Sequence, residues 1–166
     1  MENKLYKIDK KPYKNSKNIA RNILPASVSN YLTPIEKKAL AELKEKIKEK
    51  YPEAEIILYG SKARGDYNEN SDIDIMIIIK DNHQINKSIS FEELEKLYFL
   101  PVDKKVKNEI LGILTDIQVK YCVSIDFQVK NKSYIETNLA GVVPLYKNIR
   151  KEGIELWLCM KKTNLH

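Results

Sequence analysis

Apolar residues along this chain recur with two different spacings, and each change of spacing predicts a new element. The first clear helix begins at a capping box, in which Thr33 is the cap, Pro34 takes the first helical position and Glu36 stands three residues after the cap. We expect this helix to run to about Lys50, because Pro52 follows soon after. The stripe predicted to be buried consists of Ile35, Ala39, Leu40, Leu43 and Ile47.

Strand patterns follow this helix. Glu55 to Tyr59 is a short apolar run, and the isoleucine-rich run from Ile73 to Ile79 is typical of a central strand that is buried on both faces. Between Lys120 and Lys130 apolar residues alternate with polar ones, which predicts a third strand whose polar face carries Asp126. Further helices are expected over 90–99, 103–118 and 133–151, the last with a break near 141–144, and a final short strand over 154–158.

The order of these elements predicts an α/β or α+β fold, with a small mixed β-sheet flanked by helices. A chain of 166 residues fits one domain. Residues 1–30 show no sustained period and contain Pro12 and Pro25, so we expect an irregular arm there, followed by a single domain over 31–166. This length leaves no room for a separate substrate domain.

The net charge of +6 is concentrated in the arm, where seven Lys and Arg residues stand against Glu2 and Asp9. The arm is either a patch for nucleic acid or an acidic partner, or a solvated tail in a lysine-rich sequence. We favour the tail, and do not expect nucleic acid as a partner, because no nucleic-acid motif accompanies the charge. The basic segment thus leaves the function to be decided elsewhere in the chain.

Two further features of the composition bear on the compartment. No apolar run is long enough to cross a membrane, and the first residues lack the apolar segment of a signal peptide, so we expect a cytoplasmic protein without a membrane partner. Without a secretory signal, Cys122 and Cys159 are expected to be free thiols.

Candidate chemistry begins at the turn between the first two predicted strands. Gly60 lets the backbone approach a ligand closely, and the amides after it open a helical turn whose N-terminus favours anions. Ser61 adds a hydroxyl donor, and Lys62 or Arg64 adds positive charge toward a triphosphate. The turn therefore predicts a phosphate site, although neither of the two common glycine-rich phosphate motifs is present.

Two carboxylates follow this turn. Asp72 and Asp74 are two residues apart, so on a strand both side chains project from one face, where they repel each other unless a cation lies between them. Magnesium suits this position because it binds a few carboxylates and completes its shell with water and phosphate. Asp126, on a neighbouring strand, is the candidate third ligand for a site with two ions about 3.5–4 Å apart. The simpler alternatives are a solvated turn with acidic strand ends and, for Asp126, an ordinary surface residue.

The combined pattern resembles a known family. Gly60-Ser61, ten intervening residues and then Asp72-Ile73-Asp74, with the forms Gly-Ser-x-Ala-Arg-Gly and Ser-Asp-Ile-Asp-Ile, are similar to the nucleotidyltransferase fold of the DNA polymerase β superfamily. The short chain and the segment from Val143 to Leu156 resemble the minimal nucleotidyltransferases, the antitoxins of HEPN/MNT toxin-antitoxin pairs. The likeness covers about residues 33–158.

This resemblance implies an activity and a set of roles. Gly60 and Ser61 would hold the phosphates of ATP, Asp72 and Asp74 would bind two magnesium ions, and Asp126 would bind one ion and help to activate the attacking hydroxyl. The expected reaction is transfer of a nucleoside monophosphate, AMP from ATP, to a hydroxyl of a protein partner, with a tyrosine of a HEPN-type toxin as the implied acceptor.

Two other functions stay open. One is a small-molecule nucleotidyltransferase of the aminoglycoside-modifying kind, against which the net positive charge and the short chain both count. The other is an antitoxin that masks its toxin by binding, without catalysis. The sequence also leaves open whether the protein forms an oligomer.

Overall fold

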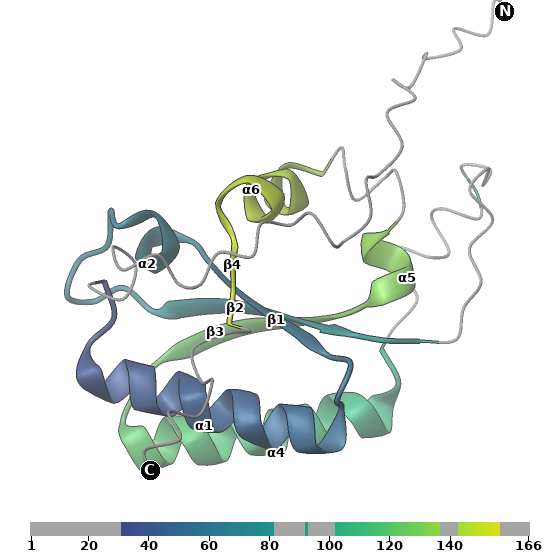
Figure 1. The fold of residues 1–166 in the computed structure, drawn as a ribbon, viewed down its shortest axis with the longest axis horizontal. Helices are drawn as coiled ribbons and strands as arrows, with labels where there is room; N and C mark the ends of the chain where they lie inside the picture. The colour runs from purple at the N-terminus through teal and green to yellow at the C-terminus, as the bar shows by residue number, and fades with distance from the viewer. Residues whose placement is uncertain (1–30, 82–91, 93–101, 137–142, 157–166) are drawn as a thin grey trace, which may run out of the picture.

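The computed structural model describes residues 31–81, 92, 102–136 and 143–156. The strands in these ranges are β1 (Glu55–Tyr59), β2 (Ile73–Ile79), β3 (Ile125–Asn131) and β4 (Ile154–Glu155). The helices are α1 (Pro34–Lys50), α2 (Ser61–Arg64), α4 (Lys104–Tyr121), α5 (Lys132–Ile135) and α6 (Pro144–Glu152). Together the strands form one sheet of order β3-β2-β1-β4, with helices on both faces (Figure 1).

The sheet is mixed, as the order of elements predicts. β1 runs antiparallel to both β2 and β4, whereas β2 and β3 are parallel and are connected through α4. A parallel pair needs such a crossover, because a short hairpin can join only antiparallel strands. The predicted fold class, a small mixed sheet flanked by helices, is therefore confirmed.

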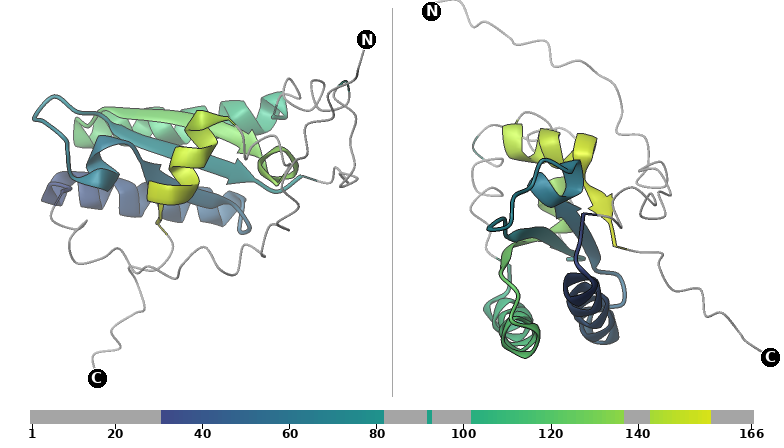
Figure 2. Two further views of the ribbon diagram at one scale, coloured as in Figure 1. Left: turned by 90° about the horizontal axis from the view of Figure 1, so that it is seen from above. Right: turned by 90° about the vertical axis from the view of Figure 1, so that its left-hand side faces the viewer.

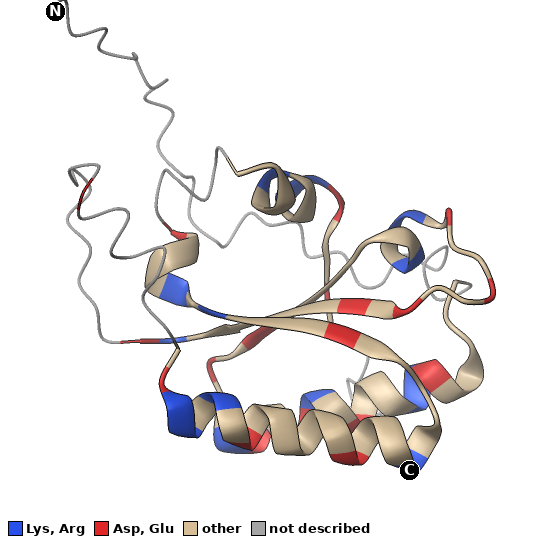
Figure 3. Ribbon diagram, turned by 180° about the vertical axis from the view of Figure 1, so that it is seen from behind, with Lys and Arg blue, Asp and Glu red and all other residues tan. Residues whose placement is uncertain are grey.

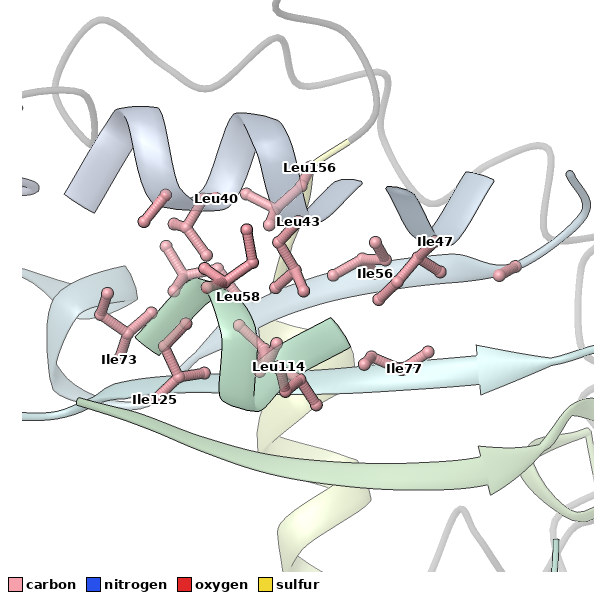
Figure 4. Close-up of a cluster of buried hydrophobic side chains, with 14 of the residues drawn as sticks. Leu40, Leu43, Ile47, Ile56, Leu58, Ile73, Ile77, Leu114, Ile125 and Leu156 are labelled. Carbon is pink, nitrogen blue, oxygen red and sulfur yellow. The ribbon is translucent and has the colours of Figure 1, made fainter. Parts of the chain in front are cut away.

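One face of the sheet carries the main hydrophobic core. α1 and α4 lie side by side on this face, while α5 and α6 lie on the other (Figures 1 and 2). Odd-numbered residues of β2, such as Ile73 and Ile77, point toward α1 and α4 and are fully buried. Figure 4 shows these side chains interleaved with Leu43 of α1 and Leu114 of α4. Even-numbered residues of β2, such as Met76, belong to a smaller cluster with α5 and α6.

The predicted start of α1 is confirmed in detail. The Thr33 hydroxyl accepts a hydrogen bond from the Glu36 backbone N–H at 3.2 Å, and the Glu36 carboxylate accepts one from the Thr33 N–H at 2.8 Å. Four of the five residues predicted on the buried stripe are buried, but Ile35 is 54% exposed. The difference arises because burial on this helix begins one turn later, at Ala39.

The boundary between α4 and β3 lies later than predicted. α4 continues to Tyr121 and ends where Cys122 adopts a left-handed conformation with φ of 50°, so β3 begins only at Ile125. The alternation within the strand is as predicted, since Ile125 is buried and Asp126 is exposed. Cys122 is exposed and carries a free thiol.

The predicted helix over 133–151 is two helices, α5 and α6, with Pro144 at the start of α6. Several predictions fall outside the described residues: the arm over 1–30, nearly all of the helix over 90–99, Cys159, and the end of the last strand after Leu156. Within the described ranges, no helix is long and apolar enough to span a membrane.

Candidate active site

The predicted phosphate turn connects β1 to β2 and is formed by α2. Gly60 has a φ of 74° and Gly65 a φ of 89°, values that favour glycine, so the turn begins and ends at residues suited to it. The N–H groups of Ala63 and Arg64 donate to the Gly60 carbonyl at 3.2 and 3.1 Å. A Cβ atom at position 60 would lie 2.1 Å from Oδ2 of Asp74, so the Gly60 backbone lies directly against that carboxylate. The turn is thus in contact with β2, the strand that carries Asp74.

Three polar side chains form a row across the sheet at the end where α2 lies, namely those of Tyr59, Asp74 and Asp126. Asp74 is the register partner of Tyr59 on β1 and of Asp126 on β3. Residues paired in this way project to the same side of a sheet. That side is the face of α5 and α6, because the neighbouring Ile73 and Ile75 enter the main core on the opposite face. Figure 3 shows acidic positions on adjacent strands at the end of the sheet where α2 lies.

The electrostatics of the row support the proximity of its members. Burial raises the pKa of Asp74 above its ordinary value, and the charges of Asp126 and Asp72 raise it further, while Arg64 acts in the opposite direction. Burial also raises the pKa of Tyr59 to about 12, with further contributions from Asp74 and Asp126. Both shifts follow from removing charge from water and from like charges lying close together. A cation between the carboxylates would relieve the repulsion.

The donor set fits a hard divalent cation, since Asp72, Asp74 and Asp126 offer only carboxylate oxygens. Across the described ranges, however, no three His, Cys, Asp or Glu side chains lie in an arrangement ready to hold a metal ion. Asp72 and Asp126 are both exposed, and Asp74 lies half-buried between them. The roles of these three residues as metal ligands therefore remain predictions, supported by proximity and donor chemistry.

Lys62 lies differently from the other predicted site residues. Its side chain is buried, and its ammonium group lies 2.6 Å from Oε1 of Glu36 on α1. The same group lies 5.3 Å from the centre of the Tyr67 ring. The structure thus brings together Gly60, Asp72, Asp74 and Asp126, with Ser61 next to Gly60, and directs Lys62 toward α1.

Arg64 lies in a more open setting. Its guanidinium group lies 3.1 Å from Asp66 and 3.5 Å from Glu152 of α6, and its side chain is 41% exposed. Its charge also reaches Asp74, where it opposes the rise in pKa that burial and the neighbouring carboxylates cause. Of the two cations predicted to meet a triphosphate, Arg64 is the one placed on the side of the carboxylates.

Sequence reasoning missed two residues at this site. Tyr59 was predicted only as the end of a strand, yet it stands beside Asp74 in the row. Its position directly before Gly60 was the available signal. Glu36 was predicted only as part of a capping box, and nothing in the sequence indicates that its second oxygen binds Lys62.

Comparisons with known proteins agree with this geometry. A family model described as a nucleotidyltransferase domain matches residues 40–152. Two similar proteins, both from Methanocaldococcus jannaschii, are named "Putative protein adenylyltransferase MJ1215" and "Putative protein adenylyltransferase MJ1379". The first is 37% identical over 45% of this chain and 87% of its own length. The second is 40% identical over 45% of this chain and 77% of its own length.

A solved structure also matches, titled as that of a "putative nucleotidyltransferase" from Sulfolobus solfataricus. The two chains are 20% identical, the match covers 75% of this chain and 81% of the other, and the TM-score is 0.39.

Proposed function

Because this chain belongs to the nucleotidyltransferase domain family, as a minimal member of the DNA polymerase β-like superfamily, we propose that it transfers AMP from ATP to a hydroxyl of a protein partner. The observation that carries the proposal is the contact between the Gly60 backbone and the Asp74 carboxylate, beside Asp126 in register. This contact places the predicted phosphate turn beside the carboxylate of β2. The names of the similar proteins favour adenylyl transfer.

In this proposal, the turn binds the nucleotide and the carboxylates hold the metal. Gly60 and Ser61 present backbone N–H groups and a hydroxyl to the phosphates. Arg64, exposed on the same side as Asp74, adds positive charge. Asp72, Asp74 and Asp126 would hold magnesium, which when bound neutralises the triphosphate and stabilises the entering and leaving oxygens.

The transfer step forms one bond and breaks another. The acceptor oxygen bonds to the α-phosphorus, the bond from that phosphorus to the bridging oxygen breaks, and pyrophosphate leaves. Asp126 accepts the proton of the attacking hydroxyl. It is suited to this role because it is exposed and lies on β3, the terminal strand in the order β3-β2-β1-β4, where an acceptor can approach.

The acceptor in this proposal is a protein. The described chain forms a single small sheet with short helices over the face that carries Asp74, and in this proposal a protein partner completes the acceptor side. The resemblance to antitoxins makes a tyrosine hydroxyl of a HEPN-type toxin the specific candidate.

The test combines purified protein, magnesium, α-labelled ATP and the product of the neighbouring gene. We expect the wild type to label that partner, and the label to disappear with Asp72→Asn/Asp74→Asn or when magnesium is chelated. Equal labelling by wild type and double variant would refute the catalytic assignment. Labelling of an aminoglycoside in place of the protein would select the small-molecule function.

A second experiment separates catalysis from masking. The double variant is expressed in cells together with the toxin. If transfer is the mechanism, the variant loses neutralisation, whereas continued neutralisation would favour an antitoxin that works by binding.

A further inference from the structure

Lys62 and Glu36 form an ion pair that joins the phosphate turn to the first turn of α1. The two charged atoms are 2.6 Å apart, and the side chains are only 6% and 13% exposed. Removing one member of such a buried pair leaves the other charge buried without a partner, which is strongly destabilising. Position 62 is therefore held from outside the turn.

The Glu36 end of this pair is itself fixed. One carboxylate oxygen binds Lys62, while the other accepts a hydrogen bond from the Thr33 N–H at 2.8 Å. The Thr33 hydroxyl in turn accepts from the Glu36 N–H. Because both oxygens are engaged and the helix end is closed by the capping box, the carboxylate is a rigid anchor for Lys62.

A second set of contacts fixes the C-terminal end of the turn, at Gly65. Gly65, which closes α2, lies against the ring of Tyr31, where a Cβ atom would come within 2.5 Å of a ring carbon. The Tyr31 and Tyr67 rings lie 5.9 Å apart, and the Lys62 ammonium group lies over the Tyr67 ring. Tyr31 and the first turn of α1 thus hold the turn at its end and at its beginning.

The opposite side of the turn faces the Asp74 carboxylate. Gly60 lies against the Asp74 carboxylate, so any shift of the turn changes the position of its backbone N–H groups relative to that carboxylate. We propose that Lys62 is a positioning residue that acts through Glu36 to fix the turn for nucleotide binding, and that it is not a phosphate ligand. The part of this inference that concerns nucleotide rests on the proposed function.

The decisive variant is Glu36→Gln, which keeps an oxygen acceptor for the capping box but removes the charge that holds Lys62. If Lys62 positions the turn, the KM for magnesium ATP rises by about tenfold or more, because small misplacements of binding groups are costly. If Lys62 instead binds phosphate, freeing it from Glu36 leaves the KM unchanged or lowers it. That result would overturn the inference.

Glu42→Gln is the matched control. Glu42 also lies on α1 and also meets a lysine at 2.6 Å, but its partner is Lys120 of α4, which is not part of the turn. We expect this variant to leave the KM within about twofold of the wild type, as surface changes away from a site usually do.

A double-mutant cycle tests whether the two residues act as a unit. Lys62→Met alone is expected to raise the KM, and adding Glu36→Gln to it is expected to cause no further rise, because the contact is already lost. Additive effects of the two changes would contradict the inference. The double variant also removes both buried charges, which avoids leaving one of them unpaired.

Hydrogen exchange provides a readout that needs no nucleotide. The N–H groups of Ala63, Arg64 and Gly65 are hydrogen-bonded within the turn, so their exchange rates report how firmly it is held. We expect Glu36→Gln, but not Glu42→Gln, to raise these rates about tenfold in the free protein. Unchanged rates would refute the positioning role even if the enzyme proved inactive. A wild type that neither binds ATP nor transfers AMP would refute the proposed function alone.

Discussion

The two faces of the sheet share the same strands but bury very different side chains. On the face toward α1 and α4, Leu43, Leu58, Ile75 and Leu114 form a continuous apolar core. On the face toward α5 and α6, the apolar cluster is smaller and ends at a row of polar groups that includes Asp74. One strand, β2, supplies both, because successive side chains point to opposite faces.

This difference indicates how the domain tolerates like charges at one end of its sheet. A core residue such as Leu114 contributes roughly 2 kcal/mol or more by leaving water. Grouped carboxylates repel one another and contribute no such stabilisation. One face therefore stabilises the fold while the other carries the groups that we propose for catalysis, and changes on the two faces should have separable effects on stability and activity.

The largest effect is expected from Asp74→Asn. Transfer activity should fall on the order of 1000-fold, because in the proposed function the variant loses a carboxylate that would hold the magnesium ion. The free energy of unfolding should not fall, since the change removes a carboxylate whose pKa is raised by burial, Asp126 and Asp72. Steady-state kinetics and urea denaturation measure the two quantities.

Asp116→Asn is the control, because Asp116 is an exposed carboxylate on α4. It should leave both quantities unchanged. A loss of stability in Asp74→Asn comparable to that of a core variant would break the distinction between the faces.

The next largest effect is expected from Leu114→Ala on the opposite face. Leu114 is fully buried, and its truncation should lower the free energy of unfolding by about 3 kcal/mol. Activity per folded molecule should remain close to that of the wild type. Leu111→Ala, at a position on the same helix that is 45% exposed, should cost less than about 0.5 kcal/mol.

Gly60→Ala tests the place where the phosphate turn meets the acidic strand. With φ of 74° and ψ of −157°, Gly60 lies in a region essentially restricted to glycine, so the backbone alone should cost alanine about 1–3 kcal/mol. The new Cβ would also displace the Asp74 carboxylate, so activity should fall as well. Gly112→Ala in α4 meets no neighbouring atom and should stabilise the protein by about 0.5–1 kcal/mol. If both alanine variants gave the same change in melting temperature, the inferred contact between Gly60 and the Asp74 carboxylate would be refuted.

The smallest effect is expected at the seam between α1 and α4. The hydrogen bonds of Glu42 with Lys120 and Tyr121 lower its pKa from 4.5 to about 2. Because the folded-state pKa is lowered, the stabilisation is present above pH 4.5 and is lost as the pH falls toward 2.

Glu42→Gln should therefore be slightly less stable than the wild type at pH 7, with a difference that vanishes near pH 2. Chemical denaturation across this range measures it. Because Glu42 is close to solvent, added salt should shrink the difference at pH 7. A difference that persists at pH 2 would show that packing, and not charge, accounts for it.

Local sequence signals predicted most of the fold. The capping box at Thr33 and the apolar run of β2 are patterns in neighbouring residues, and both elements formed as predicted. The end of α4 was missed because Tyr121 and Cys122 fit either a helix end or an alternating strand. Ile35 was misplaced because periodicity gives the direction of a side chain but not where the neighbouring layer begins.

The candidate site was predictable where spacing alone fixes geometry. Asp72 and Asp74 share a face by the period of a strand, and the alternation around Asp126 correctly gave the direction of its side chain. The placement of Lys62 was not predictable, because its contact with Glu36 joins elements 26 residues apart. Such pairings depend on how α1 and α2 pack, which no local pattern encodes.

The parallel pairing of β2 with β3 also bears on the order of events during folding. β1 and β2 are close in sequence and can pair early, whereas Asp126 follows its partner Asp74 by 52 positions and reaches it only after the α4 crossover closes. Contacts of long sequence separation form slowly, because loop-closure entropy must be overcome first. A nascent chain therefore carries Asp72 and Asp74 before the third carboxylate can join them, and competence for catalysis should be one of the last properties that the folding protein acquires.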